Sequence, residues 1–138
     1  MELLTIFVLF AIFLIIISLY NFSEQKSLKK KRSGQDITTF IEYFSGETIC
    51  KSICIEVYHS LQKHTWFRDF PVHPKDDIAK IYGICEEDFV DAIVELAEMC
   101  NRQLPSDEEI ENGNVTTILL VEDLVRFLSS LDKIVEDR

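Results

Sequence analysis

The chain has 138 residues, with 24 Asp and Glu against 14 Lys and Arg, which gives a formal net charge of −10. This length leaves room for one small folded domain beside an apolar N-terminal segment. The excess of negative charge repels phosphate backbones, so we expect no binding to nucleic acid. With only four glycines, and without GxSxG, a glycine-rich phosphate loop or HExxH, the sequence gives no sign of an enzyme.

The N-terminal segment from Leu3 to Tyr20 contains 18 residues, of which only Thr5 and Ser18 are polar. This length is just sufficient to cross the hydrocarbon core of a bilayer. A cleaved secretory signal peptide is the alternative interpretation. Against it, Glu2 and no Lys or Arg precede the apolar run, and no small-x-small cleavage site follows. We therefore predict that residues 1–22 are an uncleaved transmembrane anchor.

A cluster of basic residues follows directly after this span. Such a cluster is typical of a cytoplasmic flank, so we expect a single-pass protein of the cell (inner) membrane whose C-terminal domain is cytoplasmic. The same side chains are candidate membrane-surface contacts for anionic head groups, although orientation alone also explains them. Residues 23–35 are predicted to be a basic juxtamembrane linker, with a flexible joint at residues 33–35. The basic residues are Lys26, Lys29, Lys30, Lys31 and Arg32.

The remaining part of the chain is strongly acidic. Residues 33–138 contain nine Lys or Arg and 22 Asp or Glu, a net charge of −13. Such a domain is expected to stand off from an anionic leaflet and to associate fastest with a basic protein surface. Solubility alone also explains this acidity. We assign residues 36–138 to one acidic helical domain.

Apolar residues at three- and four-residue spacing predict helices over 36–44, 47–63, 86–100 and 118–131. Between them we expect loops at 65–72 and at 74–84, the second closed by Gly83. The last helix should bury its apolar face, and a short helix should open with a capping box at 106–109. No strand is predicted, although the β-branched run 115–121 competes. The expected inward residues of the last helix are Ile118, Val121, Leu124, Val125 and Leu128.

The loop at 65–72 carries three large aromatic side chains, Trp66, Phe67 and Phe70. They are candidates for an exposed docking site. A small domain, however, needs most of its large side chains in the core, so we favour closure of one end of the core.

The chain has four cysteines without a CxxC pair: Cys50, Cys54, Cys85 and Cys100. In the cytoplasm they should be reduced. His59 and His64 follow the first two, but their spacing does not match a tetrahedral zinc site. We therefore expect core thiols and no metal or cofactor.

Two acidic clusters, 76–77 and 86–88, invite a catalytic interpretation. Solvated carboxylates at the starts of helices explain them without any special environment. Cys85 has no neighbouring His or basic residue in the sequence to activate its thiol, so acyl transfer through this thiol is disfavoured.

The segment 74–88 resembles the part of acyl carrier proteins that ends in Leu-Gly-x-Asp-Ser-Leu. It reads Pro74-x-x-Asp77-Ile78-x-x-Ile81-Tyr82-Gly83-Ile84-Cys85-Glu86-Glu87-Asp88. Residues 90–105 are similar to that family's second helix and the Ile-Pro step after it, and residues 121–125 to its final helix. The resemblance implies an all-α fold, with the transmembrane helix followed by an acyl-carrier-like four-helix bundle. At the centre, however, Glu86 stands where the family has the serine that takes phosphopantetheine.

A carboxylate cannot be phosphopantetheinylated as a hydroxyl can, so the resemblance implies the fold without the carrier chemistry. We expect a membrane-tethered, non-catalytic interaction module that docks a basic partner protein. The alternatives are a noncovalent carrier of lipid or acyl chains, or an accessory protein of lipid metabolism, and a small helical adaptor whose similarity to carrier proteins is coincidental. By analogy with the family, the candidate partner-binding residues are Asp77, Glu86, Glu87, Asp91 and Glu95.

Overall fold

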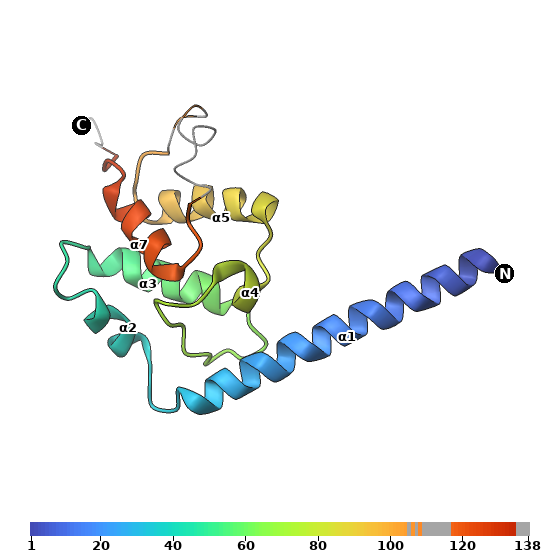
Figure 1. The fold of residues 1–138 in the computed structure, drawn as a ribbon. Helices are drawn as coiled ribbons and strands as arrows, with labels where there is room; N and C mark the ends of the chain where they lie inside the picture. The colour runs from blue at the N-terminus through green and yellow to red at the C-terminus, as the bar shows by residue number, and fades with distance from the viewer. Residues whose placement is uncertain (105, 107, 109–116, 135–138) are drawn as a thin grey trace.

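The structure is a computed structural model and describes residues 1–104, 106, 108 and 117–134. Within these residues the chain is helical and contains only two isolated β-bridges, which confirms the all-α class (Figure 1). The predicted short helix opening at 106–109 lies outside the described residues. The helices are α1 (Glu2–Lys31), α2 (Ile37–Tyr43), α3 (Lys51–Gln62), α4 (Ile78–Tyr82), α5 (Glu86–Met99) and α7 (Val121–Ser130).

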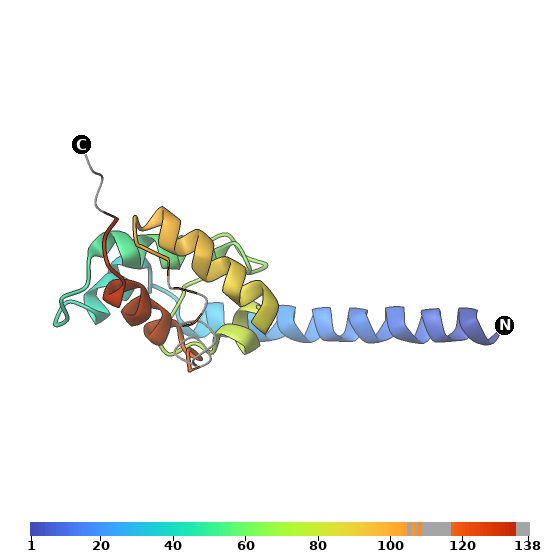
Figure 2. The same cartoon turned by 90° about the horizontal axis from the view of Figure 1, so that it is seen from above.

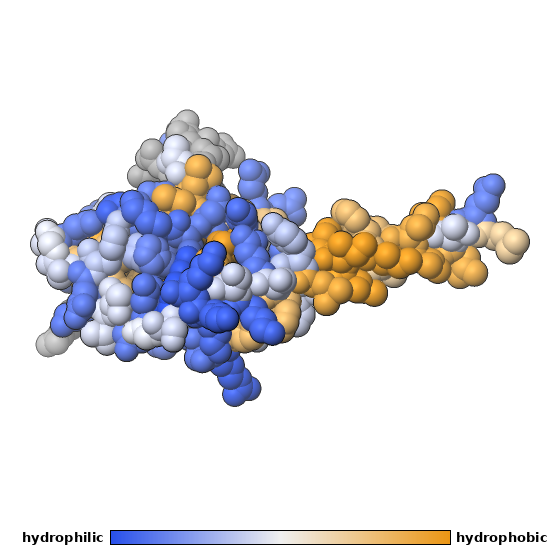
Figure 3. Space-filling view, turned by 60° about the horizontal axis from the view of Figure 1, so that its bottom comes forward, coloured by the Kyte–Doolittle hydropathy of each residue, from blue (hydrophilic) through white to orange (hydrophobic). Residues whose placement is uncertain are grey.

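Helix α1 projects from the folded domain as a single rod (Figures 1 and 2). It is long and apolar enough to cross a membrane, and none of its most apolar 18-residue window is buried in the protein. At 1.5 Å per residue its 30 residues extend for about 45 Å. That is about 15 Å more than a typical hydrocarbon core. In the space-filling view the apolar surface of the rod contrasts with the mostly polar domain (Figure 3).

Helix α3 is at the centre of the domain and packs against α2, α5 and α7. Ile53, Val57 and Leu61 on its inner face are at most 2% exposed. All five residues predicted to face inward from the last helix are buried as well, although Ile118 lies before the start of α7. The helical periodicity therefore identified the core faces correctly.

Two helices begin later than predicted, because the residues before them form a turn in one case and an extended segment in the other. Residues 44–48 form the turn after α2, so α3 starts at Lys51 instead of residue 47. Residues 118–120 run extended beside the loop before α4, where Ile78 N donates to Leu119 O at 3.0 Å. The last helix then starts at Val121, with the Asp123 carboxylate accepting from Leu120 N at 3.0 Å.

The predicted loop at 74–84 contains a short helix, α4. Asp77 caps its start by accepting from Lys80 N at 2.8 Å. Gly83 ends it in a left-handed conformation with φ of 68°, which glycine adopts without strain. Asn101 adopts φ of 55° after α5, a left-handed conformation that commonly ends a helix.

The segment expected to be a linker is a continuation of α1 up to Lys31. Its inner side packs on the domain. Buried Gln25 donates to Ile81 O at 2.9 Å and accepts from Trp66 N at 2.9 Å. Only residues 32–36 connect α1 to α2, and Gly34 has φ of 89° there.

The sequence predicted a solvated carboxylate at Asp76. In the structure this residue is instead buried, with 4% of its surface exposed. Arg32 donates to both of its oxygens, at 2.5 and 2.9 Å, and the Tyr82 hydroxyl donates at 2.7 Å. Burial, followed by the Asp76 charge, raises the pKa of Tyr82, so its hydroxyl stays a donor. The loop before α4 is thereby attached to the end of α1.

Candidate functional site

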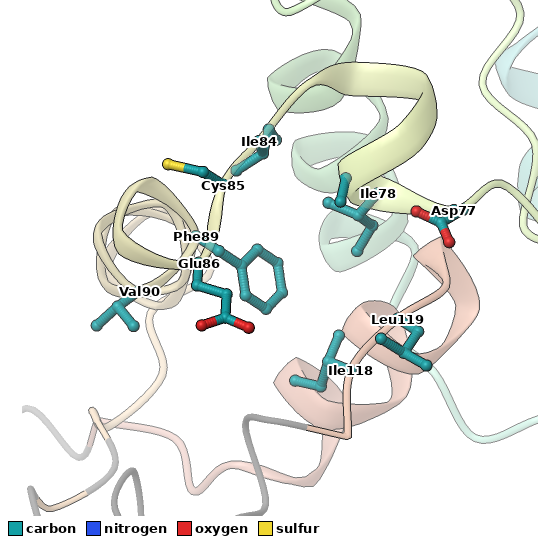
Figure 4. Close-up of a pocket in the computed structure, with 10 residues that line it drawn as sticks. Asp77, Ile78, Ile84, Cys85, Glu86, Phe89, Val90, Ile118 and Leu119 are labelled. Atoms are coloured by element: carbon teal, nitrogen blue, oxygen red, sulfur yellow. The ribbon is translucent and has the colours of Figure 1, made fainter.

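A cavity of about 450 Å³ lies between α4, the start of α5 and the extended residues before α7 (Figure 4). Its walls are mostly apolar and include Ile78, Ile84, Phe89 and Ile118. In the close-up, Ile78 and Phe89 face the space between the helices from opposite sides. A volume of this size is in the range of pockets that hold small apolar ligands.

Polar groups stand at the edge of this cavity. Asp77 and Glu86 lie on opposite sides of it, at the starts of α4 and α5 (Figure 4). The Cys85 thiol points away from the cavity and donates to Asp88 at 3.1 Å. The site thus combines an apolar floor with negative charge at its rim.

The five candidate partner-binding residues are divided between two places. Asp77 is half-buried and serves as the cap of α4. Glu86 is exposed at the cavity rim. Glu87, Asp91 and Glu95 are exposed and four residues apart, so they follow one side of α5.

This side of α5 is opposite the buried residues Ile93, Leu96 and Ala97. Glu98 belongs to it too, three residues after Glu95 and seven after Asp91, and is also exposed. The spacing that predicted the core face predicts Glu98 as well, although the resemblance did not include it. We call Glu87, Asp91, Glu95 and Glu98 the acidic stripe.

The five basic residues expected at the membrane surface are divided as well. Lys26, Lys30 and Lys31 are exposed. Lys29 instead pairs with Asp69 at 2.6 Å and lies 5.0 Å from the centre of the Phe67 ring. Arg32 is committed to Asp76. Part of the basic cluster therefore attaches α1 to the domain.

A second ionic group connects α2, the 73–77 loop and α7. Glu122, 5% exposed, accepts from Lys75 at 2.5 Å and from the Tyr43 hydroxyl at 2.6 Å. The bond from Lys75, followed by that from Tyr43, lowers the pKa of the Glu122 carboxyl. Arg126 joins the group, 3.3 Å from Glu122, and binds Glu47 through two hydrogen bonds. These contacts hold the loop that leads into Asp77.

The thiols fall into two classes. Cys54 is buried and Cys100 half-buried, and burial raises the pKa of each to about 11. Cys50 and Cys85 are exposed, so the expectation of core thiols holds for only part of the set. A hydrogen bond with the Ser52 hydroxyl lowers the pKa of Cys50. Among the described residues no three His, Cys, Asp or Glu side chains are grouped as metal ligands.

The chain matches no protein-family model, and neither a curated protein nor a solved structure matches it. The protein is therefore described by its own structure alone. It is an all-α domain carried on a long apolar helix, with an apolar cavity next to an exposed acidic helix face.

Proposed function

We propose that the protein is a membrane-tethered interaction module that docks a basic partner protein through the acidic stripe of α5. The observation that carries this proposal is the charge of α5: six of its 14 residues are Asp or Glu and none is Lys or Arg. Glu87, Asp91 and Glu95 succeed one another at four-residue spacing, where like charges destabilise a helix. A basic surface would relieve that repulsion and be attracted from a distance.

The proposed topology is a single pass through the cell (inner) membrane by α1, with the domain in the cytoplasm. The length and apolar surface of α1 support the span. The basic residues that follow, of which Lys26, Lys30 and Lys31 are exposed, support the cytoplasmic side. In Figures 1 and 2, α5 starts at the end of the domain from which the apolar part of α1 projects. A partner bound at the start of the acidic stripe would therefore lie close to the membrane.

In this proposal the domain acts without covalent loading. The position that the resemblance assigns to the phosphopantetheine-bearing serine is Glu86, an exposed carboxylate. Incubation of the full-length protein with coenzyme A and a phosphopantetheinyl transferase should leave its mass unchanged. A mass increase of one phosphopantetheine group would contradict this part of the proposal.

The docking proposal is tested by charge reversal on the stripe. The triple variant Glu87→Lys, Asp91→Lys, Glu95→Lys should lose proteins that co-purify with the wild-type chain from solubilised membranes. The matched control reverses three exposed acidic residues elsewhere, Glu42, Glu108 and Asp132, with the same change in net charge. If both variants retain every co-purifying protein, the stripe is not a docking surface.

The cavity supports a second candidate function, noncovalent binding of a lipid or acyl chain, as expected of a carrier or accessory protein of lipid metabolism. Its apolar walls and volume of about 450 Å³ favour this alternative. The purified protein would then contain lipid that organic solvent extracts, detected by mass spectrometry. Ala79→Phe, which adds a ring to the cavity lining, should reduce the amount. A lipid-free wild-type preparation counts against this function.

A further inference from the structure

Trp66 is the single tryptophan of the chain and is 60% exposed. It belongs to the turn after α3, whereas Phe70 further along is fully buried and closes the core as predicted. The Trp66 ring instead packs edge-on against Phe22 of α1, with the ring centres 6.0 Å apart. Phe67 also packs against the Phe22 ring, with the ring centres 5.3 Å apart. A large aromatic surface is thus left open beside α1.

The height of this aromatic group along α1 is fixed. Phe22 follows Tyr20, the last residue of the apolar run, by two residues, a rise of about 3 Å. The helix is unbroken there. The position of the turn along α1 is set by a hydrogen bond in which Trp66 N donates to the side-chain oxygen of buried Gln25 at 2.9 Å. Trp66 is therefore held within about one helical turn of the level where the span ends.

The charges around the turn are basic, in contrast to the rest of the domain. Lys63 and Arg68, which precede and follow Trp66 in the sequence, are exposed, and so is Lys26 on α1. The acidic residues nearby are paired: Asp69 with Lys29 at 2.6 Å, and Glu24 with Lys80 at 3.8 Å. An anionic surface facing this edge would meet cations.

We propose that the turn at residues 65–68 is a second membrane contact, in which the Trp66 indole lies in the interfacial layer and Lys63 and Arg68 face anionic phospholipid head groups. The proposal rests on α1 being the membrane anchor. An amphipathic indole is favoured at this depth, and basic side chains are attracted to the charged leaflet. The acidic domain thus stands off from the leaflet except at this edge, which sets its orientation and that of the acidic stripe.

The proposal is tested by the fluorescence of Trp66 in the full-length protein, reconstituted into vesicles of phosphatidylcholine and phosphatidylglycerol. Lipids brominated near the head of the acyl chain should quench most of the emission, and aqueous iodide should quench little. The control, Trp66→Phe with Thr38→Trp, moves the reporter to an exposed site on α2, at the far end of the domain in Figures 1 and 2. Its emission should show the opposite pattern.

The contribution of the charges is measured with Lys63→Glu and Arg68→Glu combined, which should reduce lipid quenching of Trp66 in these vesicles. Resistance of the protein to carbonate extraction reports separately on the anchor. If the protein is resistant but Trp66 is quenched by iodide as strongly as the control reporter, the second contact is wrong and the anchor stands. Release of the protein by carbonate would overturn both. Protection of Trp66 from iodide without quenching by brominated lipid would indicate a protein surface over the turn and would also overturn the proposal.

Discussion

Arg32 and Asp76 form a two-point ion pair, with bonds of 2.9 and 2.5 Å, between the residue that caps α1 and the loop before α4. Their side chains are 15% and 3% exposed. Asp76 also accepts from Tyr82 and from the backbone N–H of His73, and its own carbonyl accepts from Val121 N. Asp76 thus links α1 to α4 through its carboxylate and to α7 through its carbonyl.

Replacing Arg32 with Ala leaves the Asp76 carboxylate buried without its cation. Breaking a buried pair in this way typically costs about 3 kcal/mol, so we expect a loss of that order in the free energy of unfolding. Denaturation of the full-length protein in detergent, followed by circular dichroism, measures it. The control, Lys30→Ala, removes an exposed charge two residues away and should change stability by less than about 0.5 kcal/mol. Equal effects of the two variants would contradict the structural role of the pair.

His73 makes stability depend on pH. Burial, followed by the nearby Arg32 charge, lowers its pKa from the ordinary value of 6.5, and its Nδ1 accepts from Lys75 N at 3.1 Å. Because the folded state holds the proton less tightly than the unfolded state, the stabilisation is present above pH 6.5 and is lost as the pH falls from there towards the lower folded pKa.

His73→Gln should therefore flatten the decline in stability below pH 6.5. The measurement is the denaturation midpoint as a function of pH for the wild type and the variant. His64→Gln, at an exposed site, is the control and should keep the wild-type slope. An unchanged slope in His73→Gln would show that this histidine is not the group responsible.

The thiols should react in two groups. Cys50 and Cys85 are exposed, and we expect a maleimide to modify both in the native protein at neutral pH. Cys54 and Cys100 should be modified much more slowly, since burial restricts access and raises the pKa of each to about 11. Peptide mass spectrometry after timed labelling identifies the sites. Rapid modification of Cys54 in the folded protein would contradict its placement in the core.

The attachment of α1 can be tested at Gln25, which bonds both Ile81 and Trp66. Gln25→Leu keeps the size of the side chain but removes the partner of two partly buried backbone groups, Ile81 O and Trp66 N–H, at a cost of about 2 kcal/mol. Hydrogen exchange should then increase at Trp66 N–H more than in the centre of α3. Unchanged protection of this amide would show that Gln25 does not hold the turn.

The parts of the fold predicted well from the sequence depend on local signals. The periodicity of α5 and α7 and the stop at Gly83 can both be recognised along the chain. The attachment of α1 was missed because it depends on partners 39 to 56 residues away. A helical signal was present, however. The inward positions Gln25, Leu28 and Arg32 have three- and four-residue spacing, but the surrounding lysines made the segment resemble a solvated linker.

The candidate site was predictable in the same limited way. The stripe on α5 follows from helical spacing, which also gives Glu98. Asp77 was grouped with it through the resemblance alone, and its carboxylate is used to cap α4. The cavity could not be predicted, because it forms where the extended residues 118–119 come to lie beside α4 and α5. That pairing depends on the tertiary structure.

The most direct test of the central claim is a photocrosslink from the stripe itself. A benzoylphenylalanine residue at Asp91, in the full-length protein in native membranes, should yield a specific adduct with another protein, identifiable by mass spectrometry. The same residue at Thr38 on α2 should not yield that adduct. If the variant with benzoylphenylalanine at position 91 yields no protein adduct, or only the adducts that the variant at position 38 yields, a docking function for α5 is contradicted.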